Sequence, residues 1–549
     1  MEKKLLLYFT FLIFSFARGQ NTVGTISITE DAFDAFTLIS VHNNAYLFNN
    51  CGEVVNEWNS TYPPGNSVYL LPNGNLLRAG RVSDVPSNIT FGGSGGVVEL
   101  YNWDGDLIWS YLHISNDFRQ HHDVYPMPNG NVLILAATVM SNAEAIAAGR
   151  DPNNMSDTVL YNERIFEVEP VGTNDVNVVW EWNVKDHLIQ DFDITKANFG
   201  NVSMDPGKLD INFLNGGSGG ANWLHFNSIQ YDENLDQIVI SSRNLSEIYI
   251  IDHSTTIAES ETNTGGTYGK GGDFLYRWGN PLAYKQGTLA DQTLFGQHYP
   301  HYIEGGLVDA GKIIVFNNGN GRTPPFSNVE IINPPTTAPG VYAYTPNTSF
   351  GPLAAEYSYS DQSSTPSAFY SPILSSAQRL PNGNILICEG ASGEIFELDS
   401  NENEVWRYVN PVSNVSGSIT TQGDTAPLSN TVFRAIKYAT DYPAFTGRDL
   451  TPGDPLELNP DLTPCQSLSV NDFDIVGLKV YPNPVKSNLI IETEKTIQSI
   501  LIYDILGKKI EDLAGNIKTI SFNDFANGMY LVKIITQDNS IITRKIIKN

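Results

Sequence analysis

The sequence of 549 residues is poor in cysteine and in basic residues, and it has no long apolar run outside its first residues. Three cysteines allow one disulfide bond at most, which excludes a disulfide scaffold. The 32 Lys and Arg residues face 60 Asp and Glu residues, so the net charge is −28. This acidity argues against nucleic-acid binding and against electrostatic docking on anionic lipid. After the first residues, no segment has the ~18 continuous apolar residues that a membrane helix needs.

Glycine, asparagine, serine, threonine and tyrosine are abundant instead, whereas charged residues make up only 17 % of the chain. This composition is typical of an all-β, turn-rich, secreted protein and not of a helical or disordered one. The length exceeds that of one ordinary domain, so we expect several folding units or a large repeat fold.

The first residues have the pattern of a secretory signal peptide, which we place at residues 1–19. Lys3 and Lys4 form a basic start, Leu5–Ala17 is apolar, and small residues follow at a cleavage site. The apolar run is too short to favour the alternative, a membrane anchor. We therefore expect an exported protein.

The last residues differ in kind from the rest, and we place a separate domain at 478–549 after a linker at 459–477. Lysine and arginine outnumber acidic residues here, and apolar residues alternate along short segments separated by turns. The segments Leu489–Ile491, Ile500–Tyr503, Met529–Ile534 and Ile541–Ile547 predict strands of a small β-sandwich.

Three motifs in this domain carry a family resemblance: Val480-Tyr481-Pro482-Asn483-Pro484, Tyr503-Asp504-Ile505-Leu506-Gly507-Lys508 and Asn527-Gly528-Met529-Tyr530. With the final Lys-rich strand, they resemble the C-terminal sorting domain of the type IX secretion system of Bacteroidetes. The resemblance implies handling by the type IX machinery, passage through the periplasm, and release or display outside the outer membrane.

The body, residues 20–458, contains a recurring hairpin of an apolar strand, a polar turn and a strand that ends in an aromatic residue. The predicted hairpins are Tyr46–Trp58, Val98–Trp109, Ile165–Trp182, Ile248–Trp278, Val341–Tyr357 and Ile395–Trp406. We expect the terminal aromatics Trp58, Trp109, Trp182, Trp278 and Trp406 to pack as wedges.

A second hairpin lies between these units, and its turn is Pro-Asn-Gly-Asn in three copies that begin at Pro72, Pro128 and Pro381. Weaker copies lie at 231–240 and 308–315. Asn-Gly tolerates the positive φ angles of a tight turn. Two hairpins per unit and six units predict a six-bladed β-propeller; a solenoid or a β-sandwich is the less favoured alternative.

Histidines recur at the start of the predicted inner strands: His121 and His122, then His225, then His298 and His301, with Arg243 closing one hairpin. Such positions face the central channel of a propeller. Three histidines suit a Zn²⁺ site, whereas histidine with arginine suits an anion, because guanidinium binds planar oxyanions in a bidentate manner. The residues alone leave both sites open.

These residues resemble those of the bacterial arylsulfotransferases, most specifically in His225-Phe226-Asn227-Ser228 and Ile240-Ser241-Ser242-Arg243. The resemblance implies a six-bladed propeller that moves a sulfuryl group from an aryl sulfate to a phenol through a sulfohistidine, with no nucleotide or metal cofactor. It makes His298 the nucleophile, with His225, Arg243 and His122 as further catalytic residues. We assign Asn227, His121 and His301 to substrate binding. His122 is preferred to His121 because Asp123 adjoins it.

Two further sequence features bear on this interpretation. The glycine-rich run Gly265–Gly271 lacks the spacing of a phosphate-binding loop, so we expect a flexible insertion there. A disulfide bond between Cys51 and Cys388 would join the first and last predicted blades. The alternative function is a non-catalytic secreted propeller that binds a ligand or a surface.

Overall fold

The computed structural model describes residues 21–361, 368–466, 478–493, 495–504, 508–537 and 541–549. The expected signal peptide and residues 467–477 of the expected linker lie outside these residues. The chain divides into two compact units, Met1–Pro464 and Cys465–Asn549. The all-β expectation is confirmed, since the helices in the described residues are short: α1 (Asn142–Ala147), α2 (Ile257–Ser260), α3 (Thr463–Gln466) and the 3₁₀ turns Pro152–Asn154, Val184–His187, Val202–Met204, Pro281–Tyr284, Leu289–Asp291 and Pro443–Phe445.

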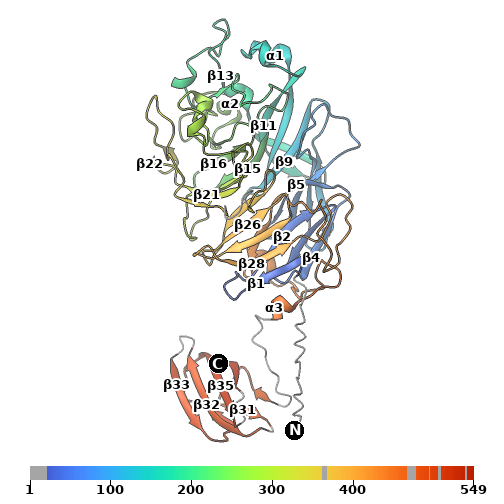
Figure 1. Ribbon diagram of the computed structural model, residues 1–549, viewed down its shortest axis with the longest axis vertical. Helices are drawn as coiled ribbons and strands as arrows, with labels where there is room; N and C mark the ends of the chain where they lie inside the picture. The colour runs from blue at the N-terminus through green and yellow to red at the C-terminus, as the bar shows by residue number, and fades with distance from the viewer. Residues whose placement is uncertain (1–20, 362–367, 467–477, 494, 505–507, 538–540) are drawn as a thin grey trace, which may run out of the picture. The chain divides into compact units, whose positions relative to one another are not determined.

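Within its described residues, the first unit consists mainly of six antiparallel sheets (Figure 1). Three of them use four consecutive strands, and a fourth does so except that β22 (Thr336–Ala338) and β23 (Val341–Tyr342) intervene before its last strand. They are β5 (Pro64–Leu70), β6 (Leu76–Arg81), β7 (Gly96–Tyr101) and β8 (Leu107–Leu112); β9 (Phe118–Pro126), β10 (Val132–Ser141), β11 (Val159–Val171) and β12 (Asp175–Asn183); β15 (Phe226–Asp232), β16 (Gln237–Ser242), β17 (Glu247–Asp252) and β18 (Tyr276–Trp278); and β19 (His298–Tyr302), β20 (Ile313–Asn317), β21 (Asn328–Ile332) and β24 (Tyr357–Tyr359).

The other two sheets combine strands from both ends of the unit. Strand β29 (Ile436–Ala439) pairs with β2 (Ala35–Val41), and β3 (Asn44–Phe48) and β4 (Val54–Asn59) complete that sheet. Strand β1 (Gly24–Ile28) pairs with β28 (Glu404–Val409), beside β27 (Glu394–Leu398), β26 (Ile385–Glu389) and β25 (Ser376–Arg379). Figure 1 accordingly shows the blue strands β2 and β4 next to the orange strands β26 and β28.

The predicted hairpins are confirmed except the fifth. The Pro-Asn-Gly-Asn turns join β5 to β6, β9 to β10 and β25 to β26. In the fifth sheet, however, β24 pairs with β21, whose Val329 and Ile331 are buried. The predicted strand at Val341 forms instead a separate two-stranded ribbon of β22 (Thr336–Ala338) and β23 (Val341–Tyr342), because Val341 stays exposed and cannot join the core. A second small pair is β13 (Leu188–Ile189) with β14 (Leu209–Asp210).

The predicted tryptophan wedges are confirmed, and each indole also makes a hydrogen bond to a neighbouring sheet or its insertion. All five side chains are buried, with at most 4 % of their surface exposed. Each Nε1–H donates to a backbone carbonyl at 2.7–3.1 Å. The pairs are Trp58 with Asn102, Trp109 with Asp175, Trp182 with Gly272, Trp278 with Pro352, and Trp406 with Asn50.

The bridge between Cys51 and Cys388, which the sequence left possible, does not form. Cys388 is a free thiol on β26, fully buried in an apolar cluster with Phe48 and Trp406. Burial raises the pKa of this thiol, so it stays protonated. Cys51, in contrast, is disulfide-bonded.

The second unit is a β-sandwich of two sheets over one apolar core. One sheet contains β30 (Lys479–Tyr481), β31 (Asn488–Glu492) and β34 (Thr519–Ser521), and the other contains β33 (Lys509–Ala514), β32 (Ile497–Asp504), β35 (Gly528–Thr536) and β36 (Ile541–Lys548). Leu489 and Ile491 alternate with exposed residues on β31, as expected for a strand that covers a core on one face. They pack with Ile500, Val532 and Ile534.

A buried ion pair ties several sheets of the first unit together. Arg434, just before β29, lies 2.9 Å from Asp123 of β9. The Asp123 carboxylate also accepts hydrogen bonds from the Tyr69 hydroxyl and the Ile229 backbone, at 3.2 and 3.1 Å. The guanidinium lies 3.7 Å from the centre of the Tyr299 ring. Residues of β5, β9, β15 and β19 therefore meet at one charge pair.

Replacing Arg434 with Met should leave the Asp123 carboxylate buried without its counter-charge. We expect this change to lower the free energy of unfolding by about 3–5 kcal/mol. Urea denaturation followed by tryptophan fluorescence measures it. The double variant Arg434→Met with Asp123→Asn should recover most of the loss, because no net charge then remains buried. A single variant as stable as the parent would contradict this account.

Candidate active site

The predicted site residues come from the first strand of three successive sheets. His121 and His122 lie on β9, and His298 and His301 lie on β19. Asn227 lies on β15, a strand that begins directly after His225. Strand β15 contacts both β9 and β19. Arg243 follows β16, and its amide donates to the carbonyl of His225 at 3.1 Å. The fold thus brings together residues that are far apart in sequence.

Each of the three strands departs from regular pairing where it carries a site residue. Register shifts occur between Ile134 and Ala136 opposite β9, at Asn227 on β15, and between His298 and His301 on β19. His122, His225 and Tyr299 have φ angles of 51°, 51° and 53°, in the left-handed region that non-glycine residues seldom occupy. Bulges of this kind re-aim side chains and are common beside active sites.

Aromatic and imidazole rings form a compact cluster at these bulges. The ring centres of His122 and His225 are 4.7 Å apart. Phe91 contacts His121, His122 and His225, at 4.8, 5.9 and 5.5 Å between ring centres. Phe433 lies 6.3 Å from both His122 and His298. His122 and His298 each expose only 3 % of their surface.

The hydrogen bonds around His298 define which of its nitrogens is available for chemistry. Nδ1 lies 2.7 Å from Oδ1 of Asn318, and the Asn318 amide donates to the carbonyls of Ser371 and Leu374 at 2.7 and 2.9 Å. These two donations fix the orientation of the amide, so its oxygen faces the imidazole. A neutral His298 must then donate from Nδ1, which leaves the lone pair on Nε2.

His121 and His122 are bonded to each other and to a carboxylate. The Nδ1 atoms of the two rings are 3.0 Å apart, and Nε2 of His121 lies 2.8 Å from Oε2 of Glu163. His122 was preferred to His121 because Asp123 adjoins it, but the Asp123 carboxylate pairs with Arg434 and not with His122. It is the contact with His225 that brings the His122 ring into the cluster.

The remaining predicted residues differ in their surroundings. Arg243 is partly buried and donates to Asn244 at 3.3 Å. Asn227 is fully buried, and its amide donates to the carbonyl of Gln297, the residue before His298, at 2.8 Å. Its Oδ1 has no hydrogen-bond partner among the described residues. His301 bonds the carbonyl of Tyr299 at 3.1 Å and packs on the Tyr299 ring, outside the imidazole cluster.

The environment favours the neutral form of every imidazole for which a shift is resolved in this cluster. Burial, and then the positive charge that His225, His121, His298 and Arg243 would carry, hold the pKa of His122 well below its usual value. Burial and then Arg243 lower the pKa of His225 in the same way. Burial lowers the pKa of His298 to about 3, with Arg243 and Arg434 acting in the same direction and the Asn318 hydrogen bond opposing them. The fixed positive charge of the cluster is thus on Arg243.

A glycine-rich segment between β6 and β7 covers this cluster, and sequence reasoning did not use it. Gly93 has a φ of 84°, and a Cβ atom there would lie 2.1 Å from Nε2 of His122. A Cβ atom on Gly95 would lie 1.9 Å from Oε1 of Gln120. Glycine therefore permits the close approach of the backbone to His122. The signal in the sequence that could have revealed this loop is the run Phe91-Gly92-Gly93-Ser94-Gly95-Gly96. Glu163 and Asn318 were missed as well.

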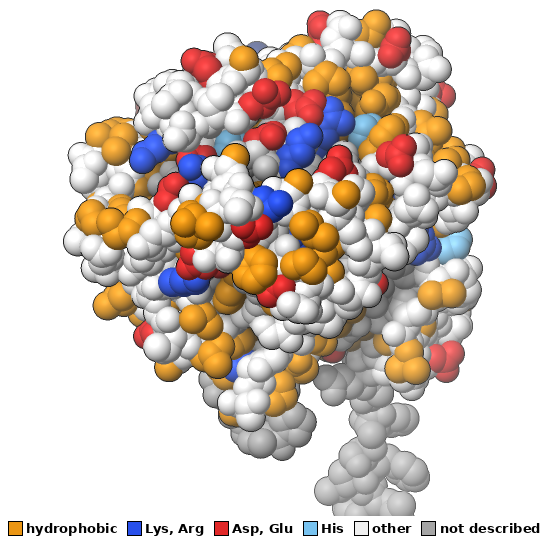
Figure 2. All heavy atoms as spheres, turned by 90° about the horizontal axis from the view of Figure 1, so that it is seen from above, with side chains coloured by type: hydrophobic (Ala, Val, Ile, Leu, Met, Phe, Trp, Pro, Cys, Tyr) orange, Lys and Arg blue, Asp and Glu red, His pale blue; other side chains and the backbone are white. Residues whose placement is uncertain are grey.

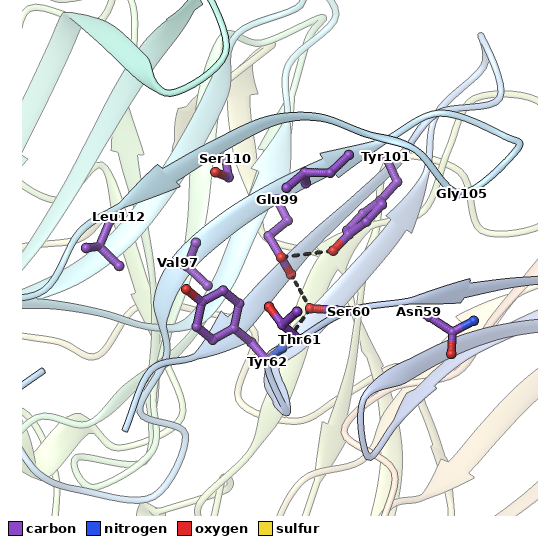
Figure 3. A pocket seen from close by; sticks show the side chains of 11 residues that line it. Asn59, Ser60, Thr61, Tyr62, Val97, Glu99, Tyr101, Gly105, Ser110 and Leu112 are labelled. Carbon is purple, nitrogen blue, oxygen red and sulfur yellow. Dashed lines mark hydrogen bonds between the residues drawn. The ribbon is translucent and has the colours of Figure 1, made fainter. Parts of the chain in front are cut away.

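A pocket of about 560 Å³ lies elsewhere in the unit, between the end of β4 and strands β7 and β8 (Figure 3). Its polar centre is Glu99, which accepts hydrogen bonds from Ser60 and Tyr101 at 2.8 and 2.9 Å. None of the predicted site residues lines it. Among the described residues, no group of three or more His, Cys, Asp or Glu side chains is arranged to hold a metal ion.

Comparison with known protein families decides the assignment of the body. The model of the family described as Arylsulfotransferase (ASST) matches residues 87–426, which include every predicted site residue. The chain belongs to the arylsulfotransferase family. This membership supports sulfotransferase activity at the level of the family. A second model, the secretion system C-terminal sorting domain, matches residues 479–549.

The sorting domain of this arylsulfotransferase indicates handling by the type IX secretion system and a location outside the cell or on its surface. No helix in the described part of the chain has the length and apolar character needed to cross a membrane.

Several solved structures are similar to the arylsulfotransferase chain at low sequence identity. A protein of unknown function from Bacteroides caccae is 11 % identical, with a TM-score of 0.39 over 74 % of this chain and 98 % of that chain. The periplasmic gluconolactonase of Pseudomonas aeruginosa is 10 % identical, with a TM-score of 0.35 over 74 % and 99 %. A virginiamycin B lyase of Staphylococcus aureus is 10 % identical, with a TM-score of 0.32 over 71 % and 88 %. No curated protein matches the chain.

The low pKa of His298 predicts a pH-dependent stability of the arylsulfotransferase. Below pH 6.5 the unfolded chain binds a proton that folded His298, with a pKa of about 3, does not accept. Stability should therefore fall as the pH drops from 6.5 towards 3. His298→Gln should reduce that slope by up to about 1.4 kcal/mol per pH unit, measured by urea denaturation between pH 4 and 6.5.

His253→Gln is the matched control for this experiment. Burial lowers the pKa of His253, but Asp236 and Glu167 outweigh it and raise the pKa to about 9. Folded His253 is protonated throughout this range, whereas the unfolded chain loses that proton near pH 6.5, so its removal should not reduce the slope measured between about pH 5.5 and 6.5. Equal slopes for His298→Gln and the parent would contradict the assigned pKa.

Gly93→Ala should destabilise the arylsulfotransferase by about 1–3 kcal/mol, because the new methyl group adds backbone strain and displaces His122. Gly92→Ala is the matched control, since a Cβ atom on Gly92 has no neighbour within 4 Å. Thermal unfolding of the two variants measures the difference. Equal melting temperatures would show that the loop does not press on His122.

Proposed function

We propose that this protein is an exported, nucleotide-independent aryl-sulfate sulfotransferase that works through a sulfohistidine on His298. The observation that carries the proposal is the unprotonated Nε2 of His298, which the Asn318 hydrogen bond defines and which lies in a cluster with the positive charge of Arg243. A neutral imidazole is a competent nucleophile at neutral pH, and a cation beside it suits an anionic substrate.

In the first half-reaction, Nε2 of His298 attacks the sulfur atom of the aryl sulfate. An N–S bond forms as the S–O bond to the aryl group breaks, and the aryl oxygen leaves as a phenolate that takes a proton from a histidine of the cluster. In the second, the acceptor phenol returns a proton to that histidine as its oxygen attacks the same sulfur, and Nε2 of His298 regains its lone pair. Sulfuryl transfer resembles phosphoryl transfer in its loose transition state, so positioning and charge stabilisation dominate the catalysis. Ping-pong kinetics follow.

The other residues of the cluster hold the sulfate and the oxygen of the leaving group. Arg243 offsets the charge of the sulfuryl oxygens. The Asn222 amide lies 2.6 Å from Nδ1 of His225 and donates to it, so a neutral His225 presents an Nε2–H as a hydrogen-bond donor. The Asn227 amide donates to the carbonyl of Gln297 and thereby positions His298. Its unpartnered atom is Oδ1, a hydrogen-bond acceptor, which cannot bind the oxygens of a sulfate. His121 bonds His122, and His301 packs on the Tyr299 ring.

We propose further that the six sheets are the blades of a closed six-bladed β-propeller spanning residues 20–458. The pairing of β29 with β2 and the bond from Trp406 to Asn50 both join the last part of the ring to the first, which supports closure. A signal peptide at 1–19, a linker at 459–477 and the sorting domain at 478–549 complete the chain and imply a route through the periplasm.

The surface gives the substrate no long-range guidance in this proposal. The chain carries a net charge of −28, which repels anionic sulfates. On the face shown in Figure 2, acidic and basic side chains are interspersed with apolar ones. Recognition of the anion therefore depends on short-range contacts, above all with Arg243.

Release of 4-nitrophenol from its sulfate ester, with and without added phenol, tests the proposal. We expect release that depends on the acceptor and falls by at least about 10⁴-fold in His298→Ala, because the nucleophile is gone. His253→Gln, a buried histidine outside the cluster, should keep the parent activity. In the absence of acceptor, sulfur-labelled donor should label the parent protein but not His298→Ala. Full activity in His298→Ala, or no turnover with any phenol, would favour a non-catalytic propeller.

A further inference from the structure

We propose that Glu163 and His121 form a proton relay behind His122, so that His122 exchanges a proton with the phenol oxygen without itself carrying a positive charge. The inference rests on the proposed sulfotransferase function. His122 is the catalytic residue in this scheme, whereas His121 and Glu163 act through it as positioning residues. The residues form one continuous chain of contacts from a buried carboxylate to the cluster.

The contacts within this chain are short and fully buried. Glu163 lies on β11 with 1 % of its side chain exposed, and His121 exposes none. Oε1 of Glu163 accepts the backbone N–H of Phe226 at 2.9 Å, and Oε2 lies 2.8 Å from Nε2 of His121. With one oxygen already occupied, the other is oriented towards His121. Phe91 packs against both imidazoles and encloses the pair.

The contact between the two Nδ1 atoms allows two proton arrangements. At 3.0 Å the two atoms share one hydrogen, because one ring must donate and the other accept. If the hydrogen is on His122, both rings are neutral and Nε2 of His122 has a lone pair. If it is on His121, that ring is an imidazolium paired with Glu163, and Nε2 of His122 carries a hydrogen.

Transfer between these arrangements balances the proposed reaction. As the S–O bond of the donor breaks, Nε2 of His122 gives its proton to the phenolate oxygen, and Nδ1 of His122 takes the shared proton from His121. In the second half-reaction the acceptor phenol gives its proton to Nε2 of His122, and the shared proton returns to His121. The positive charge therefore appears next to Glu163 and never on the ring that faces Arg243 and His225.

This location of the charge removes a conflict within the cluster. The positive neighbours of His122 oppose a second positive charge on its ring. On His121 the same charge is compensated by the Glu163 carboxylate at 2.8 Å. A donor for the leaving phenolate is thus available beside Arg243 without a positive charge on the His122 ring.

The test compares two donors whose leaving groups differ in their need for a proton. Phenolate is a strong base and leaves with a proton, whereas 4-nitrophenolate leaves without one. For Glu163→Gln we expect kcat/KM to fall by about 10²-fold with phenyl sulfate but by less than about 10-fold with 4-nitrophenyl sulfate. Glu167→Gln is the matched control, since Glu167 lies on the same strand and also pairs with a histidine, His253, at 2.9 Å. It should change both donors equally.

An unchanged ratio between the donors in Glu163→Gln, with the parent enzyme active, would overturn the relay alone. If the parent turns over neither donor, the proposed function fails and the relay with it. Should Glu163→Gln not unfold cooperatively, His121→Gln must show the same shift in donor ratio. If neither variant folds, the ¹⁵N spectrum of histidine-labelled parent protein decides: hydrogens on both Nδ1 and Nε2 of His121 are expected in the resting enzyme, and a neutral His121 would overturn the relay.

Discussion

The buried pair of Asp123 and Arg434 is the interaction on which the geometry of the site depends. Asp123 follows His122 directly in the chain, and Tyr299, which packs on the guanidinium, follows His298. Ile229, which donates to the carboxylate, lies two residues after Asn227. One charge pair therefore anchors the backbone beside each site residue on β9, β15 and β19. Without such anchors, the left-handed conformations of His122 and Tyr299 would relax.

The site carries a positive charge on the Arg243 guanidinium and favours the neutral form of His122, His225 and His298. Burial lowers the pKa values of His122, His225 and His298, and Arg243 lowers them further. Arginine stays charged in such surroundings, whereas histidine loses its proton and keeps a lone pair. A cation and an uncharged imidazole therefore lie in one cluster.

The sequence predicted the strands of the body well because their turns are local signals. Pro-Asn-Gly-Asn marks a tight turn wherever it occurs, and the tryptophans mark the last strands. The prediction failed at Val341, where a short apolar run was taken for a strand of the fifth sheet. The strand that pairs with β24 is instead β21, whose Val329 and Ile331 are buried, and the repeat pattern overlooked that segment.

The sequence indicated the histidines and Arg243 of the candidate site, but it did not indicate their hydrogen-bond partners. The histidines and Arg243 were found from their recurrence along the chain and from the family resemblance. Glu163, the partner of His121, and Asn318, the partner of His298, are 42 and 20 residues away in sequence, and no local pattern marks them. Adjacency misled in one case: Asp123 follows His122 in the chain, yet its carboxylate pairs with Arg434.

The pairing of the two ends of the first unit also sets the timing of its folding. Leu38 cannot find its partner Ile436, nor Ile28 its partner Trp406, until almost the whole unit is present. Contacts between such distant residues form slowly. Until then β2 and β28 are open sheet edges, which invite pairing with other chains. Pairing of β29 with β2 therefore covers an edge that could otherwise lead to aggregation.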